Sequence, residues 1–197
     1  GDEPGGSGKY IAAVFRNSRI TEAVREFLAR DGLILGICNG FQALIKLGLV
    51  PHGDITEVGP HSPTLTGNAI GRHVSRIVRV AAVSGLSPWL AGFPVGETRL
   101  VAVSHGEGRL VAGPEEAGRW LAAGQVATRY VDDRGLPSMD PLVNPNGSIQ
   151  AIEGLTSPDG RIFGRMGHPE RWTPGLFLNV PGDFDHQLFR AGVDFFA

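Results

Sequence analysis

The chain has 197 residues, of which 42% are hydrophobic, and a formal net charge of −2, so it is large enough to bury the core of one globular domain. This nearly balanced charge differs from the excess of positive charge that is typical of a protein that binds nucleic acid or an anionic membrane surface, and so argues against these two classes. No apolar run reaches the roughly 20 residues that cross a bilayer, and a single cysteine excludes an internal disulfide framework and fits a reducing, cytoplasmic location.

The N-terminal part predicts two helices, a strand and a third helix. Apolar residues recur at helical spacing over residues 10–30, with a break at Asn17-Ser18, a pair of residues typical of a helix cap. Residues 32–37 are almost wholly apolar and predict a strand buried on both faces of a parallel sheet. The following helix is expected to end at Gly48, with Pro51 just beyond it.

The rest of the chain predicts strands, turns and one closing helix. Strand patterns cover residues 70–83, 99–104, 125–131, 149–155 and 160–166, and a helical piece is expected before Gly124. The closing helix is expected within 185–196, with one apolar face made of Leu188, Phe189, Gly192, Val193 and Phe196. Helices around a parallel core strand, with added β hairpins, predict an α/β fold, and we expect one domain over residues 1–197.

The segment Gly36-Ile37-Cys38-Asn39-Gly40 has the form of a nucleophile elbow with cysteine as the nucleophile. A tight turn between a strand and a helix lifts the side chain out of the sheet, and the helix N-terminus favours the thiolate. The alternative for Cys38 is a small hydrophobic residue of the core.

A cysteine nucleophile needs a base, and His168 is the candidate, because it directly follows the strand expected over 160–166. Glu170 lies two residues on and can accept the second N–H of the imidazole. The alternative is a surface turn in which both side chains face water. A further polar cluster, Ser104 to Gly108, predicts either a substrate-recognition loop or a plain hairpin turn. Nothing in the sequence has the spacing of a metal site, and residues 5–10 do not match a phosphate-binding loop.

With Cys38, His168 and Glu170 in place, the chain resembles the class I (triad) glutamine amidotransferases. Further blocks resemble the glutaminase domain of phosphoribosylformylglycinamidine synthases, in particular the long-chain bacterial form: residues 36–42 (GICNGFQ), 71–75 (GRHVS), 103–108 (VSHGEG), 144–148 (NPNGS) and 156–160 (TSPDG). The resemblance implies a flavodoxin-like α/β sheet with helices on both faces that hydrolyses glutamine.

The resemblance also implies roles for seven residues. Cys38 attacks the carboxamide, His168 moves protons and Glu170 orients the imidazole. Asn39 donates its backbone N–H to the oxyanion, Gln42 holds glutamine, and Ser104 and His105 contact the α-amino or carboxylate end. This domain is expected to need no cofactor, and its ammonia is expected to reach an ATP- and Mg-dependent synthetase domain on the N-terminal side of the same polypeptide.

The chain departs from the family pattern at its start, where Gly1-Asp2 looks like the last part of a longer upstream block. The resemblance therefore implies an N-terminally truncated fragment without the first strands, whose strand over 32–37 has an unpaired edge. Two other interpretations stay open: a catalytically silent structural or interaction module, and another triad amidotransferase or cysteine hydrolase on the same scaffold.

Overall fold

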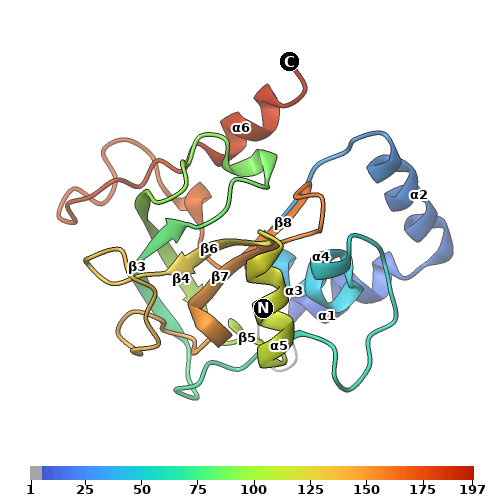
Figure 1. Ribbon diagram of the computed structural model, residues 1–197, viewed down its shortest axis with the longest axis horizontal. Coiled ribbons are helices and arrows are strands. Elements are labelled where there is room, and N and C mark those ends of the chain that lie inside the picture. Colours follow the sequence, from blue (N-terminus) through green and yellow to red (C-terminus); the bar gives the residue numbers. More distant parts are fainter. Residues whose placement is uncertain (1–5) are drawn as a thin grey trace.

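A six-stranded mixed sheet with the strand order β1-β8-β7-β6-β3-β4 forms the centre of the protein (Figure 1). It is seen in a computed structural model that describes residues 6–197, so Gly1-Asp2, expected to be the last part of an upstream block, lies outside the described residues. The strands are β1 (Ile34–Ile37), β3 (Val74–Ala82), β4 (Thr98–His105), β6 (Val126–Tyr130), β7 (Ile152–Thr156) and β8 (Ile162–Arg165). Only β1 and β8 pair in parallel, and the other neighbours are antiparallel. The strands β2 (Thr64–Thr66) and β5 (Arg109–Val111) form a separate antiparallel pair.

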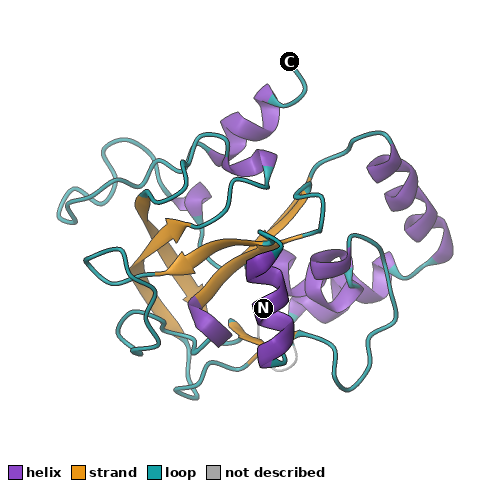
Figure 2. Ribbon diagram, viewed as in Figure 1, coloured by secondary structure: helices purple, strands orange, loops and turns teal. Residues whose placement is uncertain are grey.

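Helices cover the sheet on two sides. The helices are α1 (Ser7–Phe15), α2 (Ser18–Ala29), α3 (Asn39–Leu47), α4 (Leu49–His52), α5 (Pro114–Ala122) and α6 (Leu188–Asp194). In Figure 2, α1, α3, α4 and α5 lie together beside the sheet, whereas α6 lies near the C-terminus at the top of the view. The side chains form two core clusters: one joins α3, α4 and α5 to β7 and β8, and the other joins β3, β4 and α6. The α/β fold class predicted from the sequence is confirmed.

Local signals set the ends of the first helices, as predicted. The side chain of Asn17 accepts a hydrogen bond from the backbone N–H of Arg19 and caps α2. Gly48 ends α3 in the left-handed conformation, at φ 84°, which glycine adopts without steric cost. Pro51 lies beyond the end of α3, as expected, and belongs to the separate short helix α4, which the sequence did not predict.

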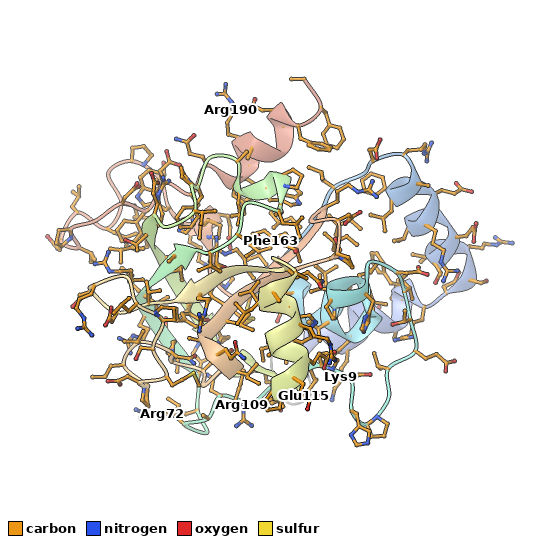
Figure 3. All side chains as sticks on the ribbon, viewed as in Figure 1. Lys9, Arg72, Arg109, Glu115, Phe163 and Arg190 are labelled. Carbon is orange, nitrogen blue, oxygen red and sulfur yellow. The ribbon has the colours of Figure 1, made fainter. Side chains whose placement is uncertain are left out.

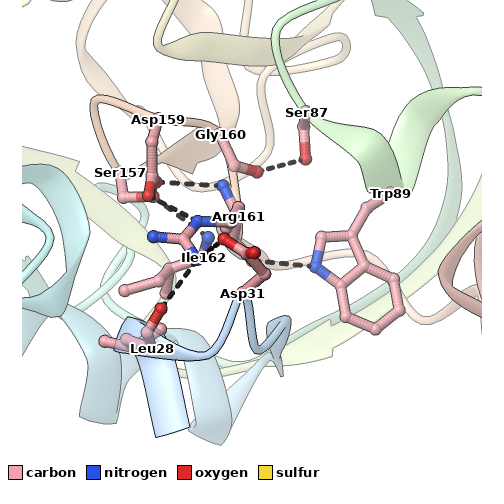
Figure 4. A network of polar contacts seen from close by, with 9 residues as sticks. All are labelled: Leu28, Asp31, Ser87, Trp89, Ser157, Asp159, Gly160, Arg161 and Ile162. Carbon is pink, nitrogen blue, oxygen red and sulfur yellow. Dashed lines mark hydrogen bonds and ion pairs between the residues drawn. The ribbon is translucent and has the colours of Figure 1, made fainter. Parts of the chain in front are cut away.

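An arginine network ties the end of α2 to the turn between β7 and β8 (Figure 4). Arg161 donates to the backbone carbonyl of Leu28, pairs with Asp31 at 3.1 Å and pairs with Asp159 at 2.7 Å. The indole N–H of Trp89 donates to the carbonyl of Arg161. This network fixes the entry to β8, the strand that leads to His168.

Three expectations were wrong. The strand β1 is only partly buried: it is an edge strand of the described sheet, as the resemblance implied, and its successive residues Ile34 and Leu35 pack partly buried against the two core clusters. The segment 149–155 starts as a 3-10 turn, because Gln150 and Ala151 have positive φ angles of 50° and 56°, and extended pairing begins only at Ile152. In the C-terminal segment Leu188 is buried, but Phe189, Val193 and Phe196 are exposed.

Figure 3 shows the contrast between the core and the periphery: Phe163 of β8 lies near the middle of the molecule, and Arg72 and Arg190 lie at its margins.

Over residues 6–197, none of the helices combines the length and apolar character required to cross a bilayer.

Two paired glycines let α3 lie directly against the sheet. Gly36 of β1 and Gly164 of β8 are opposite each other in the parallel register. A Cβ atom on Gly164 would lie 2.0 Å from the ring of Phe41, and one on Gly36 would lie 2.5 Å from Leu44. Because these two positions lack side chains, α3 can approach the sheet closely. Cys38 lies at the N-terminal end of this helix.

We expect Gly164→Ala to destabilise the protein by about 1–3 kcal/mol, because the added methyl group overpacks the contact with Phe41. The matched control is Gly40→Ala in α3, where a new Cβ meets nothing within 4 Å and alanine favours the helix by up to about 1 kcal/mol. Urea unfolding of both variants measures the two changes in the free energy of unfolding. Equal values for the two would contradict the packing argument.

Candidate active site

Cys38 lies on a strained turn between β1 and α3. Its backbone has φ 52° and ψ −104°, a region that side-chain-bearing residues rarely adopt and that is typical of functional sites. Its N–H donates to the carbonyl of Arg165 over 2.8 Å, and its own carbonyl accepts from the N–H of Gln42. The thiol contacts the carbonyl of Ser104, with 3.9 Å between sulfur and oxygen. The nucleophile elbow predicted from the sequence is therefore present as a backbone geometry.

His168 is brought to the same edge of the sheet by β8. Because β1 and β8 are parallel neighbours, their carboxyl ends lie side by side, with Ile37 opposite Arg165. The N–H of His168 donates to the carbonyl of Ala102 in β4 over 2.8 Å. Its Nδ1 lies 2.6 Å from Oε1 of Glu170, and its buried Nε2 has no hydrogen-bond partner among the described residues. With Nδ1–H donating to Glu170, Nε2 carries the lone pair and can accept a proton.

Glu170 is ionised beside this imidazole. Burial would raise the pKa of its carboxyl group, but the hydrogen bond from His168 and the nearby Arg171 outweigh burial and hold the pKa below its usual value. A carboxylate in this position fixes the tautomer of His168 and stabilises its protonated form. The sequence-based alternative, in which both side chains face water, is wrong for His168, which is buried.

The turn after β4 contacts α3. The side-chain amide of Gln42, itself buried, donates to the carbonyl of Glu107 over 2.6 Å. Asn68 ties the turn together, since it accepts from the N–H of Gly108 and donates to the carbonyl of His105. The hydroxyl of Ser104 lies 3.0 Å from Nε2 of His73.

His105 is a fully buried, neutral imidazole. Burial, together with the neighbouring His73 and His168, lowers its pKa to about 4. Its Nδ1 lies 3.1 Å from Oδ1 of Asn68, which already acts as an acceptor for Gly108, so Nδ1 carries the proton. Its Nε2 is therefore an acceptor, and it has no partner within the described chain.

The predicted residues lie on three chain segments that meet at one edge of the sheet. Cys38, Asn39 and Gln42 belong to the elbow and α3, Ser104 and His105 end β4, and His168 and Glu170 follow β8. Direct contacts link the segments: Cys38 to Ser104, Cys38 to Arg165, and His168 to Ala102. The side-chain oxygens of Asn39 and Gln42 are buried there without a hydrogen-bond partner in residues 6–197.

Sequence reasoning missed a buried charge pair beneath the site. Glu153 of β7 and Arg165 of β8 are fully buried and lie 3.2 Å apart. The available signal was one acidic and one basic residue inside two otherwise apolar strand patterns. Asn68, which organises the turn after β4, was also missed, and nothing in its turn-rich segment distinguishes it.

We expect the free energy of unfolding to fall as the pH drops from about 6.5, because two histidines are buried in neutral form. Burial, with the nearby Arg165, lowers the pKa of His186 to about 3, and that of His105 is lowered to about 4. The unfolded chain then binds protons that the folded chain does not, so each histidine costs about 2 kcal/mol at pH 5.

Urea unfolding between pH 7 and pH 5 measures this slope. His186→Gln keeps a donor for the carbonyl of Leu100 and an acceptor for Arg165, and should reduce the slope by about half. His61→Gln, at an exposed position, is the matched control. A slope unchanged by His186→Gln would contradict the assignment.

Comparison with known proteins identifies the family of this chain. The sequence matches the family of CobB/CobQ-like glutamine amidotransferase domains over residues 1–196. The phosphoribosylformylglycinamidine synthase subunit PurQ of Symbiobacterium thermophilum is 38% identical over 174 residues, covering 88% of this chain and 67% of that protein. The PurQ subunit of Gloeobacter violaceus is 34% identical over 194 residues, covering 96% of this chain and 77% of that protein.

Among solved structures, PurLQS from Thermotoga maritima superposes with a TM-score of 0.67 at 27% identity, covering 94% of this chain and 72% of that one. The fold, the strand-end position of the polar residues and the sequence match lead to the same conclusion. The chain belongs to the family of CobB/CobQ-like glutamine amidotransferase domains, which are class I glutamine amidotransferases, and it is homologous to the phosphoribosylformylglycinamidine synthase subunit PurQ.

Proposed function

We propose that this domain hydrolyses glutamine with Cys38, His168 and Glu170 and supplies the ammonia to an ATP-dependent synthetase. The reaction served would convert formylglycinamide ribonucleotide to the amidine in purine biosynthesis. The observation that carries the proposal is the pairing of β1 with β8, which joins a cysteine on a strained elbow to a buried imidazole held 2.6 Å from a carboxylate.

The chemistry proceeds by a thioester. His168 Nε2 takes the thiol proton as the sulfur of Cys38 attacks the carboxamide carbon of glutamine. The tetrahedral oxyanion accepts a hydrogen bond from the backbone N–H of Asn39. Because Asn39 is the first residue of α3, this N–H has no acceptor within the helix. His168 returns the proton to the departing nitrogen, ammonia leaves, and a water activated by the same imidazole hydrolyses the glutamyl thioester. Glu170 stabilises the imidazolium in both steps.

Three further residues are proposed to hold glutamine. The acceptor Nε2 of His105 suits the α-ammonium group, because a neutral imidazole with its proton on Nδ1 cannot donate to a carboxylate from Nε2. The unpartnered Oε1 of Gln42 is a second acceptor at the same edge of the sheet. The backbone carbonyl of Ser104 contacts the thiol of Cys38, and its hydroxyl, which lies 3.0 Å from Nε2 of His73, is the group proposed to contact glutamine.

The partner is proposed to be the synthetase, with ATP and Mg bound there and no cofactor in this domain, which we treat as one unit over residues 1–197. The matching relatives named above are subunits, and one solved relative is PurLQS. That the synthetase precedes this domain in one polypeptide stays a prediction from the sequence.

The test is intact-mass labelling with an electrophilic glutamine analogue. We expect a single adduct on Cys38 that glutamine prevents, since the analogue needs both the nucleophile and the glutamine-binding residues. Iodoacetamide is the control for access to the thiol. Alkylation of Cys38 by iodoacetamide without any reaction with the analogue would overturn the proposal and favour a catalytically silent interaction module.

A further inference from the structure

A buried network lies directly behind the turn that carries His168. It consists of Glu153 and Arg165 with three neighbours, Thr128, Gly167 and His186. Glu153, Arg165 and Thr128 have no exposed surface, and His186 is 2% exposed. Burying a charge pair costs free energy unless hydrogen bonds satisfy both groups. The hydrogen bonds of this pair therefore indicate what it does.

The carboxylate of Glu153 is fully used. Its Oε1 accepts from the backbone N–H of Gly167 over 2.6 Å and from Nε of Arg165 over 3.2 Å. Its Oε2 accepts from the hydroxyl of Thr128 and pairs with Nη2 of Arg165. Among these contacts, the one with Gly167 reaches a residue outside the strands, because β8 ends at Arg165. Gly167 directly precedes His168.

This contact and one from β4 together fix the turn that carries His168. The N–H of Gly167 is held by Glu153, and the next N–H, that of His168, is held by the carbonyl of Ala102. A Cβ atom on Gly167 would lie 2.8 Å from Oε1 of Glu153 and equally close to Val101, so the turn is tightly enclosed. The backbone before His168 therefore cannot shift without breaking a charge-assisted hydrogen bond.

Arg165 connects this turn to the nucleophile. Its backbone carbonyl accepts the N–H of Cys38, while its guanidinium holds Glu153. The same guanidinium donates to Nδ1 of His186, which in turn donates from Nε2 to the carbonyl of Leu100. Arg165 thus contacts the elbow through its backbone and, through its side chain, contacts Glu153, which in turn holds the N–H of Gly167.

We propose that Glu153 is a positioning residue, which, held by Arg165 and Thr128, sets the place of the His168 imidazole relative to Cys38 through the N–H of Gly167. This inference rests on the proposed function for its kinetic readout. The role depends on an acceptor oxygen at position 153, and the negative charge serves to satisfy the buried Arg165.

Two double variants separate the acceptor from the charge. Glu153→Gln with Arg165→Met removes both charges but keeps an amide oxygen for Gly167. Glu153→Leu with Arg165→Met removes the acceptor as well. Both lose the same contact to His186, and replacing a buried pair by apolar groups is often tolerated by the fold. Thermal unfolding of both variants verifies that they are folded before kinetics are compared.

We expect the Leu/Met variant to lose about 10–100-fold in kcat with a KM within about threefold of wild type, because a misplaced base affects the chemical step more than binding. The Gln/Met variant should stay within about threefold of wild type in both constants. Equal kcat values for the two folded variants, at any level, would overturn the positioning role. The protein is assayed with its synthetase partner present.

A second readout does not depend on glutamine. The pH profile of Cys38 alkylation by iodoacetamide reports how the imidazole stabilises the thiolate. We expect the profile to shift to higher pH in the Leu/Met variant only. If wild type fails to hydrolyse glutamine but this shift is seen, the proposed function fails and the positioning role stands. An identical profile in all three proteins would overturn the positioning role by itself.

Discussion

Replacing Cys38 with alanine is expected to lower glutamine hydrolysis by about 10⁴-fold or more, because removal of a covalent nucleophile leaves only binding and oxyanion contacts. The elbow geometry supports this size of effect. The thiol is the only cysteine sulfur in the chain, and the residues on either side of it, Ile37 and Asn39, carry no hydroxyl that could act as the nucleophile instead. Ammonia release, measured with the synthetase partner present, is the assay.

The fold should survive this substitution. Alanine retains the Cβ atom and so meets the same positive φ of 52° that cysteine meets. Cys38→Ser is the matched variant, because it keeps an oxygen nucleophile in the same place and should retain a trace of activity at most. Circular dichroism and urea unfolding confirm the native state. A folded Cys38→Ala protein that still releases ammonia at the wild-type rate would contradict the thioester mechanism.

Replacing His168 with glutamine is expected to lower kcat by about 10²–10⁴-fold, the usual contribution of a general acid–base group. Glutamine can still donate to Glu170 from its amide, but it cannot take the thiol proton. His168 is 7% exposed, and its Nε2 has no hydrogen-bond partner in the described chain. The neighbouring His105 is a poor replacement, because burial lowers its pKa to about 4. Steady-state kinetics with and without the partner measure the loss.

Two controls sharpen this expectation. Glu170→Gln keeps the hydrogen-bond geometry but removes the charge, and should lose about 10–100-fold, less than His168→Gln, because Glu170 acts through the imidazole. His52→Gln changes an exposed histidine on α4 and should have no effect. A Glu170→Gln loss larger than that of His168→Gln would contradict the order of roles.

The local sequence predicted the parts of this protein whose geometry depends on a few neighbouring residues. The cap at Asn17, the left-handed end of α3 at Gly48 and the elbow around Cys38 were all predicted correctly. Each follows from backbone angles and hydrogen bonds within one turn of chain. The six strands of the main sheet were located from their apolar patterns, although their ends moved by a few residues, whereas β2 and β5 were not predicted.

Local sequence patterns gave wrong predictions of burial where distant segments of the chain form the surroundings of a side chain. Val193 and Phe196 have the spacing of a buried helix face but are exposed, because α6 packs through Leu188 and Ala191 onto the 3-10 helix η1 (Pro88–Leu90) and little else covers its other side. Glu153 and Arg165 broke the apolar pattern of their strands, and only their juxtaposition explains why two charges can be buried there.

What the sequence by itself determined is therefore the inventory: a cysteine on an elbow, a histidine after a strand with a glutamate two residues on, and an α/β fold. Only the tertiary structure decided that β1 pairs in parallel with β8, which places Cys38 and His168 at adjacent strand ends, and that Glu153 holds the turn between β8 and His168. Caps and turns are set by interactions within a few residues. Strand pairing and the satisfaction of buried charges depend on which distant segments exclude water from one another, and that is decided by the whole core.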